Sequence, residues 1–198
     1  KHEETEEDRI KDTRIMKLFK HHPMFVFGLF SLLAYEIAEI SINSYFINFV
    51  TGQGWMDDNS ASMVLTVALG FFMVGRFLGS WIMRRIPAER MLMYCSLGSV
   101  SCLGVVLLDI GHWSMYALIA NYLFEAIMFP TIFSLSLQGL GNLTKSASSL
   151  LMMTPIGGCF FLLMGYVADQ TNLVVPFLIP FIGYFIVLLY ASELSRKS

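Results

Sequence analysis

The sequence predicts an all-α membrane protein with six transmembrane helices, on the basis of three observations. The chain of 198 residues is 56% hydrophobic, with a mean hydropathy of +0.63, which is too apolar for a soluble domain of this size. Its apolar runs are continuous, whereas the strands of a membrane barrel alternate between apolar and polar residues. Each run is also close to the roughly 20 residues that a helix needs to cross a bilayer. The six runs are 24–49, 61–83, 91–108, 114–137, 147–167 and 174–191.

Lysine and arginine lie on one side of this series of helices. They occur in the N-terminal segment, in the connections after the second and fourth runs, and in the C-terminal tail. These segments hold twelve of the thirteen basic residues, and the exception is Arg76 in the second run. Because basic loops stay cytoplasmic, we expect both termini inside a multi-pass protein of the cell (inner) membrane. The acidic residues expected outside are Asp57, Asp58, Asp109 and Asp169.

The chain divides into three segments. Residues 1–22 carry six acidic and six basic residues and are expected to form a cytoplasmic segment, polar throughout and unlike a signal peptide. Residues 23–191 hold the six-helix bundle, and 192–198 form a cytoplasmic tail. Because the chain begins at Lys1 with a charged segment, we expect it to be a piece of a longer protein.

Four ionisable residues lie inside the apolar runs: Glu36, Glu39, Arg76 and Glu125. Ionisable groups within a membrane are costly, and they mark functional sites by default. A helix rises about 1.5 Å per residue, which places the three glutamates roughly 18–22 Å from the inner boundary. They are therefore expected near the middle of a hydrocarbon core about 30 Å thick.

Polar neighbours accompany these glutamates at helical spacing. Glu36, Glu39 and Asn43 follow i, i+3, i+7 spacing, and Asn121 precedes Glu125 by four residues, so each set shares one helix face. Two polar stripes at matching depth predict a shared aqueous cavity that binds a substrate. The alternative is that these groups form structural hydrogen bonds with other helices.

Small and helix-breaking residues indicate where helices approach closely or bend. Gly75 and Gly79 flank Arg76 in a small-xxx-small pattern, which favours close helix packing. Arg76 lies about 10 Å from the inner boundary, so we expect a gating or packing role near the cytoplasmic side. Pro130 interrupts the fourth run and Pro155 the fifth, and such breaks are tolerated where neighbours or a water-filled cavity satisfy the freed carbonyls.

The first and fourth runs each begin a triplet of helices, and the two triplets cross the membrane in opposite senses. This order predicts an inverted 3+3 repeat with a binding site near the midplane.

Signatures of enzymes and cofactor sites are absent from the sequence. It contains no HExxH, GxSxG, P-loop or GxGxxG motif. Cys95, Cys102 and Cys159 all lie in the apolar runs, where cysteine behaves as a small apolar residue. We therefore expect no enzymatic activity, no cofactor, no metal site and no nucleic-acid partner.

Several motifs resemble major facilitator sugar porters of the fucose:proton symporter family. GRFLGSWIMRRIP at 75–87 is similar to the end of their eighth helix, and 129–158, from FPTIFSL to TPIGG, to their tenth and eleventh helices. YEIAEISINSYFINF at 35–49 is similar to the seventh helix, most closely in the glucose/galactose branch. The resemblance covers 23–191 and implies the C-terminal half, helices seven to twelve, of a twelve-helix transporter.

The resemblance implies uptake of a monosaccharide coupled to proton entry, by alternating access between two halves. L-fucose is the first expectation, and glucose or galactose the alternative. In this family helices seven and ten line the central cavity, and the missing N-terminal half carries the acids linked to proton coupling. Glu39 matches a position where the glucose/galactose branch carries Glu, whereas Glu36 and Glu125 stand where apolar or amide residues are usual.

The expected partners are thus a monosaccharide, protons, membrane lipid and the N-terminal six-helix half. Glu39 is expected to matter most, since a carboxylate accepts hydrogen bonds from two sugar hydroxyls and desolvation favours its protonated form. The candidate substrate-binding residues are Glu36, Glu39, Asn43, Asn121 and Glu125. A receptor or scaffold that kept the fold is the alternative of another class, and a collapsed apolar interior would favour it.

Overall fold

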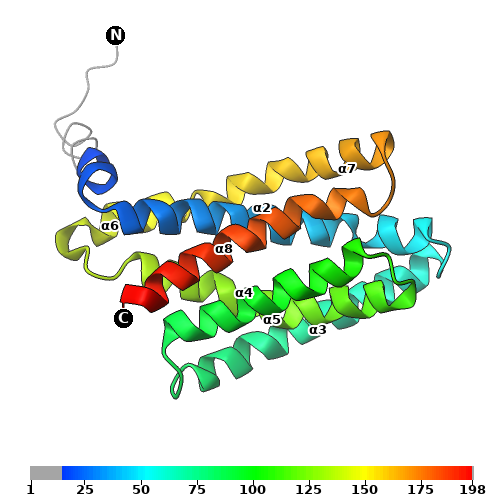
Figure 1. The fold of residues 1–198 in the computed structure, drawn as a ribbon, viewed down its shortest axis with the longest axis horizontal. Helices are drawn as coiled ribbons and strands as arrows, with labels where there is room; N and C mark the ends of the chain where they lie inside the picture. Colours follow the sequence, from blue (N-terminus) through cyan, green and yellow to red (C-terminus); the bar gives the residue numbers. More distant parts are fainter. Residues whose placement is uncertain (1–14, 198) are drawn as a thin grey trace, which may run out of the picture.

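The fold is that of a computed structural model that describes residues 15–197, and throughout this range it consists of helices joined by turns. Six helical stretches in that range are long and apolar enough to cross a membrane, in the order that the sequence predicts (Figure 1). The first four are α2 (Pro23–Gly52), α3 (Asp58–Ile82), α4 (Ala88–Leu107) and α5 (His112–Ser136). The fifth joins η1 (Gly141–Leu143), α6 (Thr144–Leu151), η2 (Thr154–Phe160) and α7 (Phe161–Gln170), and the sixth joins η3 (Val175–Phe177) and α8 (Leu178–Lys197).

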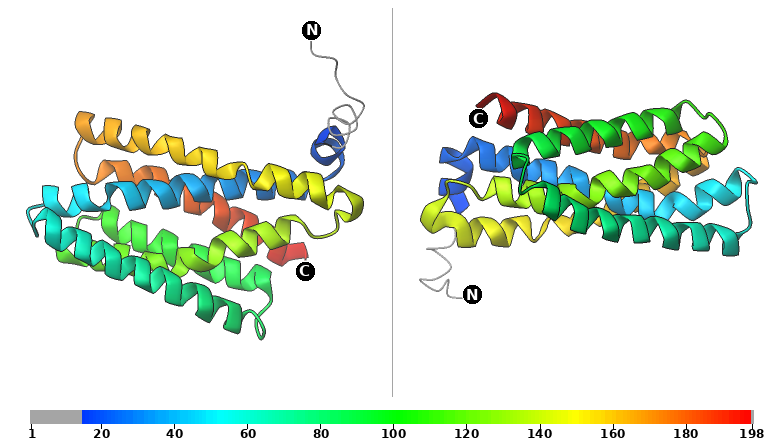
Figure 2. Two further views of the ribbon diagram at one scale, coloured as in Figure 1. Left: turned by 180° about the vertical axis from the view of Figure 1, so that it is seen from behind. Right: turned by 90° about the horizontal axis from the view of Figure 1, so that it is seen from below.

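The helices run alternately in opposite directions, so their connections gather at two ends of the bundle (Figures 1 and 2). The acidic end holds the connections around 53–57, 108–111 and 171–174, where the Gln53 amide donates to Asp109 at 3.4 Å. The basic end holds the start of α2, the α3–α4 and α5–α6 connections and the end of α8. At the acidic end, hydrogen bonding from the Ser60 hydroxyl holds the pKa of Asp57 below its usual range.

The predicted segment 1–22 is only partly described. Residues 15–21 are helical and lead into α2 at the basic end, while residues 1–14 lie outside the described range. Leu18 is fully buried, so this short helix packs against the bundle.

The packing confirms the inverted repeat. α2 packs mainly against α5, α8 and the fifth stretch, with a smaller contact to α3, and α5 packs against α2, α4 and α3. If the first stretch is exchanged for the fourth, the second for the fifth and the third for the sixth, these main neighbours of α2 become the neighbours of α5. Since α2 and α5 also cross the bundle in opposite directions (Figure 1), the two halves of the chain are related as the sequence predicted.

The two helices that carry the glutamates are central to the bundle. α2 and α5 are its most buried stretches, whereas α3 and the fifth stretch are the least buried. Large apolar side chains are exposed on these two flanks, for example Met63, Phe77 and Trp81 of α3 and Leu162 and Tyr166 of α7. Such surfaces suit contact with lipid or with further transmembrane helices.

The fifth stretch is broken where the sequence places Pro155, Gly157 and Gly158. These residues form η2, a 3-10 segment between α6 and α7. A Cβ at Gly157 would lie 2.8 Å from the Leu33 side chain, and one at Gly158 would lie 2.5 Å from Ile40. The glycines therefore let η2 lie directly on α2, beside Glu36. α5, by contrast, continues through Pro130.

Candidate functional site

A carboxyl group lies buried at the centre of the bundle. Glu125 of α5 is 0% exposed, and its Oε2 accepts hydrogen bonds from the Asn121 amide at 2.9 Å and from the Tyr184 hydroxyl of α8. Asn121 and Tyr184 are themselves fully buried. The second carboxyl oxygen, Oε1, and Oδ1 of Asn121 have no hydrogen-bond partner among residues 15–197.

Tyr35 joins α2 to this group. Its hydroxyl donates to the backbone carbonyl of Glu125 at 2.9 Å, so the two residues lie at the same level of the bundle. This confirms the matching depth predicted for the first and fourth runs. The Tyr35 hydroxyl also interacts with the carboxyl of Glu39. We refer to Tyr35, Asn121, Glu125 and Tyr184 as the carboxyl cluster.

Three polar residues form an edge of α2 outside the carboxyl cluster: Glu36, Glu39 and Asn43, here called the polar edge. Around the helix, Glu36 lies about 100° from Tyr35, which faces α5, and about 60° in the other direction from Leu33, which faces η2. Glu36 is therefore directed between α5 and the fifth stretch. It is 7% exposed, and Glu39 and Asn43 are partly exposed. The polar stripe thus borders the surface of the bundle.

The position of Glu125 corrects one expectation. As the most buried of the three acids, it does not share an open face with Glu36 and Glu39. The physical reason is that α8 packs against α2 and α4 and extends the Tyr184 side chain to the Glu125 carboxyl, to which its hydroxyl donates. Of the two sequence stripes, the one on α2 meets the surface and the one on α5 points into the bundle.

Arg76 and the glycines beside it face different surroundings. A Cβ at Gly75 would lie 2.9 Å from the carbonyl oxygen of Leu123, and one at Gly79 would lie 2.5 Å from Ile127, so this face of α3 packs tightly on α5. The exposed Arg76 guanidinium lies over the Phe72 ring, 4.8 Å from its centroid, and acts electrostatically on Glu39. Because helical side chains point towards the helix N-terminus, Arg76 extends from α3 towards the acidic end of the bundle, and its expected gating or packing role stays a prediction.

Sequence reasoning missed four aromatic residues near these acids. Tyr35 and Tyr184 supply the hydroxyls of the carboxyl cluster, and their only signal was a tyrosine in mid-run, far from the membrane boundaries. Phe129 and Phe133 of α5 stack at 6.2 Å with an interplanar angle of 22°, and both are partly exposed. Their i, i+4 spacing around Pro130, itself exposed, was the available signal.

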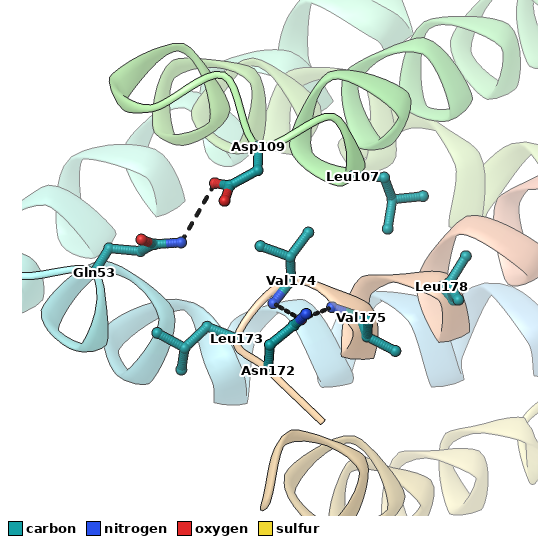
Figure 3. Close-up of a pocket in the computed structure, with 8 residues that line it drawn as sticks. All are labelled: Gln53, Leu107, Asp109, Asn172, Leu173, Val174, Val175 and Leu178. Carbon is teal, nitrogen blue, oxygen red and sulfur yellow. Dashed lines mark hydrogen bonds between the residues drawn. The ribbon is translucent and has the colours of Figure 1, made fainter. Parts of the chain in front are cut away.

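A pocket of about 680 Å³ lies elsewhere, at the acidic end (Figure 3). Its polar side chains bond to the protein itself: Gln53 to Asp109, and Asn172 to the backbone N–H groups of Val174 and Val175. These hydrogen bonds hold the connections of the acidic end in place. No residue of the carboxyl cluster lines this pocket. Within residues 15–197, no three His, Cys, Asp or Glu side chains are grouped as a metal ion would require.

Six alternating apolar helices and an inverted repeat are the arrangement of one half of the major facilitator fold. The structure of FucP, a transporter of this superfamily in the outward conformation, matches with a TM-score of 0.87 and 28% identity. The match covers 92% of this chain and 44% of FucP.

Two curated relatives identify the family within this superfamily. A glucose/galactose transporter of Brucella abortus is 34% identical over 175 residues, 87% of this chain and 42% of the relative. The L-fucose-proton symporter of Escherichia coli is 30% identical over 167 residues, 83% of this chain and 38% of the relative. No family model matches the chain. The chain belongs to the fucose:proton symporter family of the major facilitator superfamily, and it spans about half the length of the curated relatives it matches.

Proposed function

We propose that this chain is the C-terminal half of a proton-coupled monosaccharide symporter that works by alternating access. The observation that carries the proposal is the polar edge at mid-depth on α2, beside the carboxyl cluster, in a bundle that matches half of FucP. A non-transporting scaffold has no use for a partly exposed carboxyl group such as Glu39, beside the buried Glu36, at a depth where such groups are costly.

The polar edge is the sugar-contacting surface in this proposal. The carboxylates of Glu36 and Glu39 each accept hydrogen bonds from two hydroxyls, and such charge-assisted bonds are about twice as strong as neutral ones. The Asn43 amide supplies both a donor and an acceptor. Phe129, whose ring centroid lies 6.3 Å from that of Tyr35, offers a ring face to the apolar face of a sugar ring.

Asn121 and Glu125 support this surface from within. By bonding to α2 and α8, they fix how α5 sits against both helices. Arg76, with its guanidinium at the level of Glu39, is proposed to gate the same surface, while Gly75 and Gly79 hold α3 on α5. Pro130, which leaves the Ala126 carbonyl without its helical donor, is a proposed flexing point.

A hexose of the glucose/galactose type is favoured over L-fucose. L-fucose lacks the hydroxyl at carbon 6, and the two adjacent glutamates of the polar edge offer acceptors for a fully hydroxylated hexose. The higher identity to the glucose/galactose relative points the same way. L-fucose remains the alternative substrate.

We also propose that the protein lies in the inner membrane of the cell, with its basic end and both termini on the cytoplasmic side. The support is the positive-inside rule applied to the connections of the two ends. The complete transporter would include a second six-helix half that meets the polar edge across the cavity.

The test is counterflow in membrane vesicles from cells that express the full-length gene. Vesicles preloaded with unlabelled sugar should take up labelled glucose or galactose faster than unloaded vesicles. Because a symporter moves sugar and protons in the same direction, net efflux of the preloaded sugar should make the vesicle interior more alkaline. Counterflow of L-fucose alone would select the alternative substrate. Failure to exchange any of the three sugars would contradict the proposed function and favour the scaffold.

A further inference from the structure

We infer that Glu125 is a proton-binding residue of this half, holding a proton on Oε1 inside the carboxyl cluster. It lies apart from the polar edge, so it binds the proton without touching the sugar. The inference deepens the proposed function, on which it rests for the identity of the coupling ion.

The hydrogen bonds around Glu125 leave one oxygen for a proton. Both donors, the Asn121 amide and the Tyr184 hydroxyl, bond to Oε2. Oε1 is buried with no partner among the described residues. An ionised carboxylate here would place charge on a fully desolvated oxygen, which is far more costly than burying a neutral hydroxyl. A proton on Oε1 removes that charge and leaves both observed hydrogen bonds intact.

The surrounding groups favour a single proton in this region. The ionisable neighbours of Glu125 are Tyr35 and Glu39 on α2, Tyr184 on α8 and Tyr122 on its own helix. Three of these are neutral phenols at ordinary pH, and Glu39 acts on Glu125 as a like charge. Two like carboxyl groups at close range resist full ionisation of both.

Arg76 of α3 makes the charges around this region balance. Its guanidinium acts electrostatically on Glu39, so an ionised Glu39 and Arg76 compensate one another. One proton on Glu125 then leaves Glu39, Arg76 and Glu125 together electrically neutral, with Glu36 of the polar edge a further carboxyl that acts on Glu39. Removing Glu125's proton would leave a net negative charge inside the bundle.

The cluster is placed to exchange this proton as helices move. Tyr35 and Tyr184 tie Glu125 to α2 and α8, so any motion that separates these helices opens a path for water to Oε1. The O–H bond then breaks, its electron pair stays on the carboxylate and the proton passes to a water molecule. Rebinding reverses the step on the other side of the membrane.

Infrared difference spectroscopy of the reconstituted full-length protein tests this inference without measuring transport. At neutral pH the wild type should show the carbonyl stretch of a protonated, buried carboxyl group, and E125Q should lose that band. E193Q, which alters an exposed carboxyl near the basic end, is the matched control and should keep it. A band of unchanged intensity in E125Q would overturn the inference.

A second pair of variants covers the case in which E125Q does not fold. Tyr184→Phe removes a donor to Oε2 and should shift the frequency of the band. Tyr190, on the same helix as Tyr184, bonds instead to Ser136 of α5, so Tyr190→Phe should not shift it. Identical bands in the two variants would overturn the inference.

A band lost in E125Q, with no sugar counterflow in the wild type, would reject the proposed function and keep the proton site. Proton-coupled counterflow, together with a band that E125Q leaves unchanged, would keep the proposed function and reject the proton site.

Discussion

Three buried tyrosines of the bundle differ mainly in what their hydroxyls contact. The Tyr184 hydroxyl donates to the Glu125 carboxyl, and the Tyr190 hydroxyl shares a bond with Ser136 at 3.2 Å. The Tyr122 hydroxyl is buried with no partner among residues 15–197. Replacing each by Phe removes a single oxygen and leaves the packing of the ring intact. The three substitutions therefore compare hydrogen bonds of different strength in one protein.

The expected changes in the free energy of unfolding follow from these partners. A neutral hydrogen bond contributes about 0.5–1.5 kcal/mol, and Tyr184→Phe also leaves the carboxyl with only one donor, so it should fall near the upper end. Tyr190→Phe should lie near the lower end, because its bond is long. Tyr122→Phe should be neutral or stabilising, since it deletes a buried polar group that has no partner.

Thermal unfolding of the purified full-length protein in detergent measures the order. The change in Tm per kcal/mol falls as a protein grows, from roughly 2–4 °C at 150–250 residues, so in the longer full-length protein Tyr184→Phe should lower Tm by about 1–2 °C. A loss above about 3 kcal/mol for Tyr184→Phe would indicate an ionised Glu125, because hydrogen bonds to charged groups are stronger. Tyr122→Phe lowering Tm as much as Tyr184→Phe would refute the assignment of the buried bonds.

Three further outcomes are expected. Gly75→Ala should destabilise the protein by about 1–3 kcal/mol, because its Cβ would meet a backbone oxygen of α5. Gly70→Ala, whose Cβ would meet nothing within 4 Å, is the control and should not destabilise it. Thermal unfolding measures both. Gly157→Ala should push η2 away from α2 and lower sugar exchange in counterflow more than it lowers Tm; equal transport rates would contradict this. Single cysteines at Asp57 and Arg84 should react with impermeant reagents from opposite sides of the membrane, and labelling from one side would refute the topology.

The sequence was sufficient for the architecture because the bilayer constrains it so strongly. Run lengths and the placement of basic residues determined six helices and two ends, and helical rise gave a common depth for the glutamates of the first and fourth runs, in line with the bond from Tyr35, next to Glu36, to the Glu125 carbonyl. The glycine spacing of α3 likewise predicted a close approach, now seen at Gly75 and Gly79 against α5.

The site was less predictable, because a polar stripe does not reveal which neighbour covers it. Asn121 and Glu125 share a face as predicted, but α8, more than 50 residues further along the chain, places Tyr184 over it. The direction of Arg76 follows from its own helix, but its electrostatic partner Glu39 lies on another one. Interactions between distant helices determine both the partner of Glu125 and that of Arg76, and periodicity within one helix does not contain them.

The most direct test of the central claim is the sugar affinity of Glu39→Gln in the full-length transporter. This substitution keeps the shape of the side chain and removes the charge that strengthens its bonds to sugar hydroxyls. Losing a charge-assisted bond of about 1.5–3 kcal/mol should weaken affinity by roughly tenfold or more, while E193Q binds as the wild type does. Unchanged affinity in Glu39→Gln, whether or not uphill accumulation survives, would contradict the claim that the polar edge of α2 binds the sugar.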